Sequence, residues 1–273
     1  MLGQERYGGI MNKIWVVVRK EWAEVFKNRF VLVTVAFLPL VFTALPLGIM
    51  AATRSSGAMG AVSTTDMPPS FARLCGDMSG AECGQYFLVS EFLLLFMMMP
   101  LAIPVTIASY SIVGEKTTRT LEPLLATPIT TLELLLGKGL AAGLPAIGAT
   151  WGAFAIFLLG ARILAVGPGV VARLVDPMWL IAVVVVGPLL AAAAVSVAVM
   201  VSSRVSDPRV AEQLSMLVIL PLLGLFFGQI TGLLLLNETL VVWMAIGMAV
   251  VDAGLILFAT QLFQRETILT RWK

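Results

Sequence analysis

The sequence predicts an all-α integral membrane protein with six transmembrane helices preceded by an interfacial amphipathic helix. Its residues are 59% hydrophobic and 12% charged, whereas soluble domains have about 45–50% apolar and about 25% charged residues. Six apolar runs are long enough to cross about 30 Å of hydrocarbon at about 1.5 Å per residue. These runs are continuous rather than short and alternating, which argues against a β-barrel.

The six runs predict spans at roughly 30–52, 86–113, 132–160, 178–202, 211–236 and 239–262. The first follows a basic stretch, as in a signal peptide, but its apolar part is far longer than a cleavable core, so we expect it to stay as an anchor. Met1 and Met11 are both candidate starts. Residues 1–273 are interpreted as one transmembrane domain.

The distribution of basic residues predicts the orientation in the membrane. Of the 18 Lys and Arg residues, those on the side opposite the N-terminus are Arg54, Arg73, Arg162 and Arg173. The positive-inside rule then places both termini in the cytoplasm of a multi-pass cell-membrane (inner or plasma membrane) protein. The net charge of +2 does not indicate a nucleic-acid partner, and membrane lipid is the expected surrounding.

Residues 12–28 have apolar positions at helical spacing, including Ile14 and Trp22, with lysines such as Lys20 on the opposite side. This pattern predicts an amphipathic helix in the cytoplasmic interface, with its lysines toward anionic lipid. The alternative is a cytoplasmic extension of the first span.

Residues 53–85 form the one sizeable outer loop and contain the two cysteines of the chain, Cys75 and Cys83. An oxidising compartment and a short spacer favour a disulfide between them; the alternative is a pair of free thiols. The loop is interpreted as a cap, because it is too small for an independent domain without that bond.

Proline and glycine mark the interiors of three spans. Pro100 and Pro104 should kink the second span and keep it off the lipid-facing periphery. Small-residue rows in the third and fifth spans predict close helix packing: Gly139, Gly143, Gly148 and Gly152, then Gly224, Gly228 and Gly232. A bend or re-entrant turn near Gln229 is an alternative for the second row. Asp207 before Pro208 predicts the capped start of the fifth span.

Polar residues inside the spans are candidates for a substrate pathway. Glu91 lies about one turn inside the second span, and Asp252 lies deep in the last one; each could instead snorkel or make a structural hydrogen bond. The candidate pathway set is Glu91, Ser109, Tyr110, Gln213, Gln229 and Asp252. Such a set suits a lipid-like or drug-like molecule, or simply packs.

Residues 114–131 are the longest mixed polar stretch. Thr120 can cap a short helix whose first turn contains Glu122 and Pro123, and Pro128 ends it near Thr127. Thr130 and Glu133 then form a capping box for the third span. The stretch therefore predicts a braced interfacial helix that can transmit force from a cytoplasmic partner.

These residues resemble a known family. Glu115-Lys116, then Thr120-Leu121-Glu122-x-Leu124-Leu125-x-Thr127-Pro128-Ile129, then Gly137-Lys138 resemble the signature of type-2 ATP-binding-cassette (ABC) exporter permeases. The stretch "SSRVSDPRVAEQ" is similar to a loop of the sodium-exporter-like or drug-exporter-like branch. Thr117 and Arg119 depart from the pattern, in which many relatives carry an acid and a glycine.

The resemblance implies a permease subunit: a second copy or a related permease completes the pathway, and two ABC ATPase subunits, which bind MgATP, dock on the cytoplasmic face. It also implies re-entrant helices between the last two spans. No cofactor is expected in this chain, which has no phosphate-binding G-x-x-x-x-G-K-[ST] loop. The implied ATPase-coupling residues are Glu115, Lys116, Arg119, Thr120, Leu121, Glu122, Pro123, Leu124, Leu125, Thr127 and Pro128.

Two other classes of function compete. A membrane scaffold could use ATPase-driven motion to regulate a partner outside the cell, and the same coupling segment would serve it. An intramembrane enzyme fits poorly, because the chain has no histidine to serve as metal ligand or general base. We therefore expect no catalytic and no metal-binding residues.

Overall fold

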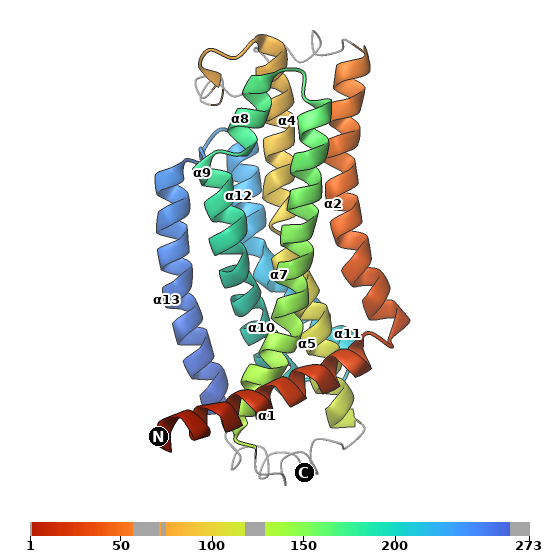
Figure 1. Cartoon of the computed structure of the whole chain (residues 1–273), viewed down its shortest axis with the longest axis vertical. Helices are drawn as coiled ribbons and strands as arrows, with labels where there is room; N and C mark the ends of the chain where they lie inside the picture. Colours follow the sequence, from red (N-terminus) through yellow and green to blue (C-terminus); the bar gives the residue numbers. More distant parts are fainter. Residues whose placement is uncertain (1, 57–70, 72–74, 118–128, 263–273) are drawn as a thin grey trace.

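The computed structural model describes residues 2–56, 71, 75–117 and 129–262. Long helices stand side by side, and one helix lies across an end of the bundle (Figure 1). In chain order the elements are α1 (Leu2–Val25), α2 (Arg29–Ser56), α4 (Gly80–Phe96), α5 (Met99–Thr117), α7 (Thr131–Leu164), α8 (Pro168–Leu174), α9 (Pro177–Ile181), a π-helical segment (Ala182–Val186), α10 (Gly187–Arg204), α11 (Pro208–Ser215), a 3₁₀ segment (Met216–Ile219), α12 (Leu220–Ile230) and α13 (Glu238–Leu262).

Six helical stretches in the described part of the chain are long and apolar enough to cross a membrane, which confirms the predicted number: Val31–Ser55, Gly80–Thr117, Leu132–Leu164, Pro168–Arg204, Pro208–Ile230 and Glu238–Ala259. The described residues contain no strand. Helix α1 lies across one end of the bundle, which we call the α1 end (Figure 1). Helix α4 begins at the opposite end (Figure 1), which we call the disulfide end because Cys83, in the first turn of α4, is bonded to Cys75.

The second span lies in the centre of the bundle and is broken in its middle. Helix α4 ends at Phe96 and α5 begins at Met99, because Pro100 has no N–H for the carbonyl of Phe96. Pro104 lies within α5 without ending it. Leu93 and Ile103, one on each side of the break, are fully buried. The predictions of a kink and of a central position are therefore confirmed.

Side-chain caps begin two helices where the sequence predicts. The backbone N–H of Thr130 donates to Glu133 Oε2 at 2.7 Å, and the N–H of Glu133 donates to Thr130 Oγ1 at 3.2 Å, which is the capping box of α7. Asp207 accepts from the N–H of Arg209 at 2.8 Å and caps α11. Each cap satisfies an N–H group that has no partner within its helix.

The glycine row in the third span does not mediate close packing, and this prediction is wrong. A β-carbon at Gly143, Gly148 or Gly152 would meet no atom within 4 Å. The close approaches of α7 are at two other glycines. A β-carbon at Gly160 would lie 2.6 Å from Leu47 of α2, and one at Gly137 would lie 2.7 Å from Val17 of α1. Spacing alone identifies a small-residue face and does not show which helix covers it.

The fourth span is longer and less regular than predicted, since it starts with α8 and α9 and contains the π-helical segment Ala182–Val186. In π-helical register the carbonyl of Val183 would accept from residue 188, but Pro188 has no N–H. The indole Nε1 of Trp151 on α7 donates to that carbonyl instead, at 3.1 Å. The irregular backbone is thus satisfied by a neighbouring helix.

Residues 231–237, between α12 and α13, form a turn and contain no helix. Gly232 has φ +72°, and the N–H of Leu234 donates to the carbonyl of Gly228 at 2.9 Å. Asn237 Oδ1 then accepts from the N–H of Leu240 at 2.8 Å at the start of α13. The re-entrant helices implied by the family resemblance are therefore absent from this segment, because a glycine turn reverses the chain directly.

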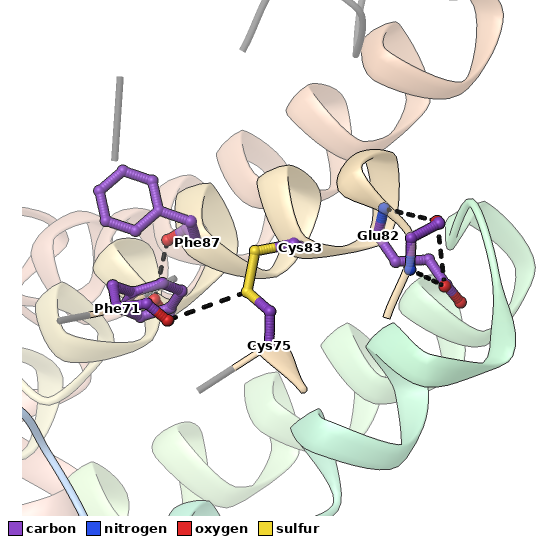
Figure 2. Close-up of a disulfide and its surroundings, with 7 residues drawn as sticks. Phe71, Cys75, Glu82, Cys83 and Phe87 are labelled. Carbon is purple, nitrogen blue, oxygen red and sulfur yellow. Dashed lines mark hydrogen bonds between the residues drawn. A yellow bond between two sulfur atoms is a disulfide. The ribbon is translucent and has the colours of Figure 1, made fainter. Parts of the chain in front are cut away.

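Cys75 and Cys83 are joined by a disulfide, with their Cα atoms 5.4 Å apart (Figure 2). Beside it, Glu82 forms a capping box with Ser79 and accepts from the N–H of Gly169 at 3.0 Å. One turn along, the buried amide of Gln85 bonds Thr53 of α2 at 3.0 Å and the N–H of Val166 at 2.9 Å. These bonds join α2, α4 and the α7–α8 connection.

Candidate functional site

Charged side chains from three helices meet in the protein interior at the α1 end. Lys20 and Glu21 lie on α1, Glu115 on α5 and Lys138 on α7. We call these four residues the ion cluster. Glu21 is 2% exposed, and Glu115 and Lys138 are each 5% exposed, so three of the four charges are removed from water, whereas the side chain of Lys20 is 32% exposed.

Lys138 is the central residue of the ion cluster. Its Nζ lies 2.8 Å from Glu21 Oε1 and 2.7 Å from Glu115 Oε2. Lys20 pairs with Glu115 as well and lies 3.5 Å from Glu21. Ser111 of α5 completes the arrangement, because its hydroxyl donates to Glu21 and accepts from Lys138 at 2.8 Å. Helices α1, α5 and α7 are thus joined at one point.

The ion cluster balances two positive charges with two negative ones, as buried charges require. Burial alone would raise the pKa of Glu21, but the charge and hydrogen bond of Lys138 outweigh it, and the pKa is lowered. Burial alone would lower the pKa of Lys20, but the hydrogen bond and charge of Glu115 outweigh it, and the pKa is raised. Both groups therefore stay charged at neutral pH.

Packing also fastens α1 to α7. Val17 lies against the backbone of Gly137, and the indole Nε1 of Trp22 donates to the carbonyl of Ala141 at 2.9 Å. Lys13 lies 3.8 Å from Glu133 at the start of α7. The expectation that the lysines of this helix face lipid is therefore wrong for Lys13 and Lys20, which pair with acids of the bundle.

Helix α5 also bonds two further helices. Nζ of Lys116 donates to the carbonyls of Ser203 and Val205, both at 3.2 Å, at the end of α10, where helix carbonyls have no partner within the helix. About three turns earlier in α5, Thr106 donates to Glu212 Oε1 of α11 at 2.6 Å. The last turns of α5, which precede residues 118–128, thus bond α1, α7 and α10.

Most of the predicted coupling residues lie outside the described part of the chain: Arg119, Thr120, Leu121, Glu122, Pro123, Leu124, Leu125, Thr127 and Pro128. The structure places the other two, Glu115 and Lys116, in the last turns of α5, where both side chains bond neighbouring helices. Residues 118–128 therefore connect two helices, α5 and α7, that are joined through Lys138.

The predicted pathway residues lie on five helices, and two of them, Glu91 of α4 and Gln229 of α12, lie side by side. Ser109 is buried in α5, Tyr110 is half-buried, Gln213 is exposed on α11, and Asp252 is buried on α13. Gln229 of α12 reaches α4, where its Nε2 donates to Ser90 at 3.4 Å.

The placement of Glu91 differs from the prediction. Helix α4 begins at Gly80, which leaves Glu91 about three turns from its start rather than one. The residue is 8% exposed, so its carboxylate does not snorkel outward.

Sequence reasoning missed Glu21 and Ser111. A signal was present for Glu21: it falls at helical spacing between Val18 and Val25, both buried, so an acid interrupts an apolar stripe. Lys138 interrupts the apolar start of the third span in the same way. Two opposite charges that each interrupt an apolar stripe are candidates for an ion pair. Their helices are distant in the sequence, so only the three-dimensional structure shows that they meet.

Within the described ranges, no group of three or more His, Cys, Asp or Glu residues is arranged to hold a metal ion. The model of one protein family, described as "ABC-2 family transporter protein", matches residues 15–262. That match includes the ion cluster, all six apolar spans and the segment between α5 and α7. A comparison with curated proteins gave no match.

Proposed function

Because the chain belongs to the ABC-2 family of transporter proteins and is thus the membrane-spanning permease subunit of an ABC transporter, we propose that it is the permease of an ATP-driven exporter. Two permeases, either two copies or this chain and a related one, form the pathway. Two separate ABC ATPase subunits bind and hydrolyse MgATP and dock on residues 114–131. The protein lies in a cell membrane, and its α1 end faces the cytoplasm.

The observation that carries this proposal is the bridge made by Lys138. A segment that receives motion from an ATPase must pass it to several helices at once, or it would only bend locally. Lys138 joins α7 to Glu115 of α5 and to Glu21 of α1, and residues 118–128 lie between α5 and α7 in the chain. Displacement of that segment therefore acts on three connected helices.

The distribution of charge supports the orientation. The disulfide end carries Arg54 and Arg173, which bond a carbonyl and an aspartate there. Lys13, Lys20, Lys116 and Lys138 belong to the α1 end, and an excess of basic residues is typical of the cytoplasmic side. A disulfide also fits an oxidising compartment at the other end.

The test uses the full chain reconstituted in vesicles with the ABC ATPase that co-purifies with it. We expect Leu121→Asp and Glu122→Lys to abolish stimulation of ATP hydrolysis while the unfolding midpoint of the permease stays unchanged. Gln261→Ala, at an exposed side chain of α13, is the control and should stimulate normally. Full stimulation in both coupling variants would overturn the assignment of residues 114–131.

The same vesicles separate export from the scaffold alternative. Loss of a candidate substrate from the cytoplasmic compartment, dependent on MgATP, supports the exporter. Vesicles that hydrolyse ATP without moving any candidate substrate, while a protein bound at the disulfide end changes its activity, would favour the scaffold.

A further inference from the structure

An apolar groove of about 210 Å³ lies between α7, α10 and α13. Gly139 and Gly143 of α7 and Ala191 of α10 contribute to it, and the space stays open because the glycines have no side chain and the alanine has only a methyl group. The lining extends along α7 from Leu132 to Ile147, which corresponds to about 22 Å of helix. The groove is therefore long and narrow and lies toward the α1 end.

The groove opens to the membrane rather than to water. Leu132, Leu136, Leu140 and Leu144 repeat every four residues along one edge and are 38–52% exposed on an apolar span. Ser196 is the hydroxyl-bearing residue of the lining, and its Oγ already donates to the carbonyl of Ala192 at 2.9 Å. A molecule that enters here must dissolve in the bilayer, and its apolar part meets an apolar wall.

An acidic residue lies beside this groove without a counter-charge. Asp252 is on the face of α13 that also carries Ile256 and Ala259, one and two turns away, and both of these line the groove. Asp252 is 5% exposed. Neither of its carboxylate oxygens has a hydrogen-bond partner among the described residues.

Asp252 has no paired Lys or Arg among the described residues. Helix α13 contacts α9, the π-helical segment and α10, and the basic residue within 177–204 is Arg204, the last residue of α10. Helix α7, which also contacts α13, carries Arg162 in its last turn and Lys138, which is engaged by Glu21 and Glu115. Burial of an acid in an apolar span is unfavourable unless a partner is present.

We propose that this groove binds amphipathic organic cations that enter from the bilayer, with the apolar chain between α7 and α10 and the positive group at Asp252. The charge selects cations over fatty acids and other anions, and the narrow groove selects an alkyl chain. The inference deepens the proposed export function, on which it rests, by naming the class of substrate.

Binding is tested without the ATPase, so that failure of the site is separate from failure of export. The full chain in nanodiscs is titrated with radiolabelled decyltrimethylammonium, and uptake by empty nanodiscs is subtracted. We expect a saturable component that decyl sulfate, with the same chain and the opposite charge, does not show. No saturable binding of the cation, or equal binding of the anion, would overturn the proposal, whereas MgATP-dependent export of another substrate would leave the transporter assignment intact.

Two variants test separately the contribution of the Asp252 charge and that of the open groove. Asp252→Asn should lower the affinity of the saturable binding about tenfold or more, as expected for loss of a charged contact. Its control is Glu238→Gln, which neutralises an exposed acid of the same helix and should bind normally. Gly143→Leu keeps Asp252 and places a side chain in the groove. A β-carbon at this position meets no atom within 4 Å, so the leucine fits without displacing a neighbour and should abolish the saturable binding.

The control for Gly143→Leu is Gly152→Leu, on the same helix, outside the groove and equally open, which should bind like the unaltered chain. Unfolding midpoints of all four variants are measured in parallel. If Asp252→Asn does not fold, the binding measured for Gly143→Leu tests the site by itself. Unchanged affinity in either groove variant, or an equal loss in its control, would overturn the site.

Discussion

Val17 of α1 lies so close to the backbone of Gly137 on α7 that a β-carbon at position 137 would be 2.7 Å from the Cβ of Val17. Real side chains do not approach this closely. A single hydrogen atom at Gly137 thus sets the distance at which α1 crosses α7, and the ion cluster depends on that distance.

We expect Gly137→Ala to displace α1 and to lower both the unfolding midpoint and the stimulation of the partner ATPase. In an unobstructed helix the same change would stabilise by about 1 kcal/mol. Gly148→Ala is the matched control, because a β-carbon there meets no atom within 4 Å. Val17→Ala removes only the outer atoms of the opposing side chain, whereas Val17→Gly removes its Cβ and should restore coupling in the Gly137→Ala background. A Gly137→Ala protein with normal coupling would contradict this account.

Replacement of Lys138 should lower the stability of the protein more than replacement of a surface charge. We expect Lys138→Met to destabilise the protein by about 3–5 kcal/mol, because Glu21 then lacks its closest counter-charge in a buried site. Adding Glu21→Gln should recover part of that loss. Thermal unfolding of both single variants and the double variant gives the coupling between the two side chains; strictly additive effects would show that they do not interact.

The ion cluster predicts a dependence of stability on pH at both extremes. The pKa of Glu21 is below its ordinary value of 4.5, so its contribution is complete above 4.5 and is lost as pH falls through the lower, folded value. The pKa of Lys20 is above its ordinary value of 10.5, so its contribution is complete below 10.5 and is lost as pH rises through the folded value. Unfolding midpoints of Glu21→Gln should fall less steeply in acid than those of the unaltered chain.

Reduction should loosen the disulfide end without disturbing the ion cluster. Cys75 and Cys83 are separated by eight residues, and closing a loop of that size stabilises by about 2–3 kcal/mol in the chain-entropy account. Cys83→Ser should lower the midpoint accordingly and leave stimulation of the ATPase unchanged. Mass spectrometry after alkylation provides the direct measurement: incorporation at both cysteines without reductant would show that the bond is absent.

The sequence predicts the spans, their caps and the kink well because these depend on local chemistry. An apolar run, the Thr130–Glu133 pair and Pro100 act within a few residues. The structure has the capping box and the break at the predicted residues, whereas the second and fourth spans begin earlier than predicted, at Gly80 and Pro168. The pattern predicts a packing face where the groove lies, because Gly139 and Gly143 indicate room without indicating a neighbour. Glu21 was missed as a site residue because two of its partners, Ser111 and Lys138, are 90 and 117 positions away along the chain.

The two-residue interruption at Met97 and Met98 gives the central span a joint. Its upper segment is held by the bonds of Glu82 and Gln85, and its lower segment by the bonds of Glu115 and Lys116. Pro100 has no N–H for the carbonyl of Phe96, and the N–H groups of Met97 and Met98 donate to the carbonyls of Leu94 and Leu95 in short turns instead of the α-helical pattern. If the partner ATPase moves the lower segment, as proposed above, we expect the tilt between the two segments to change.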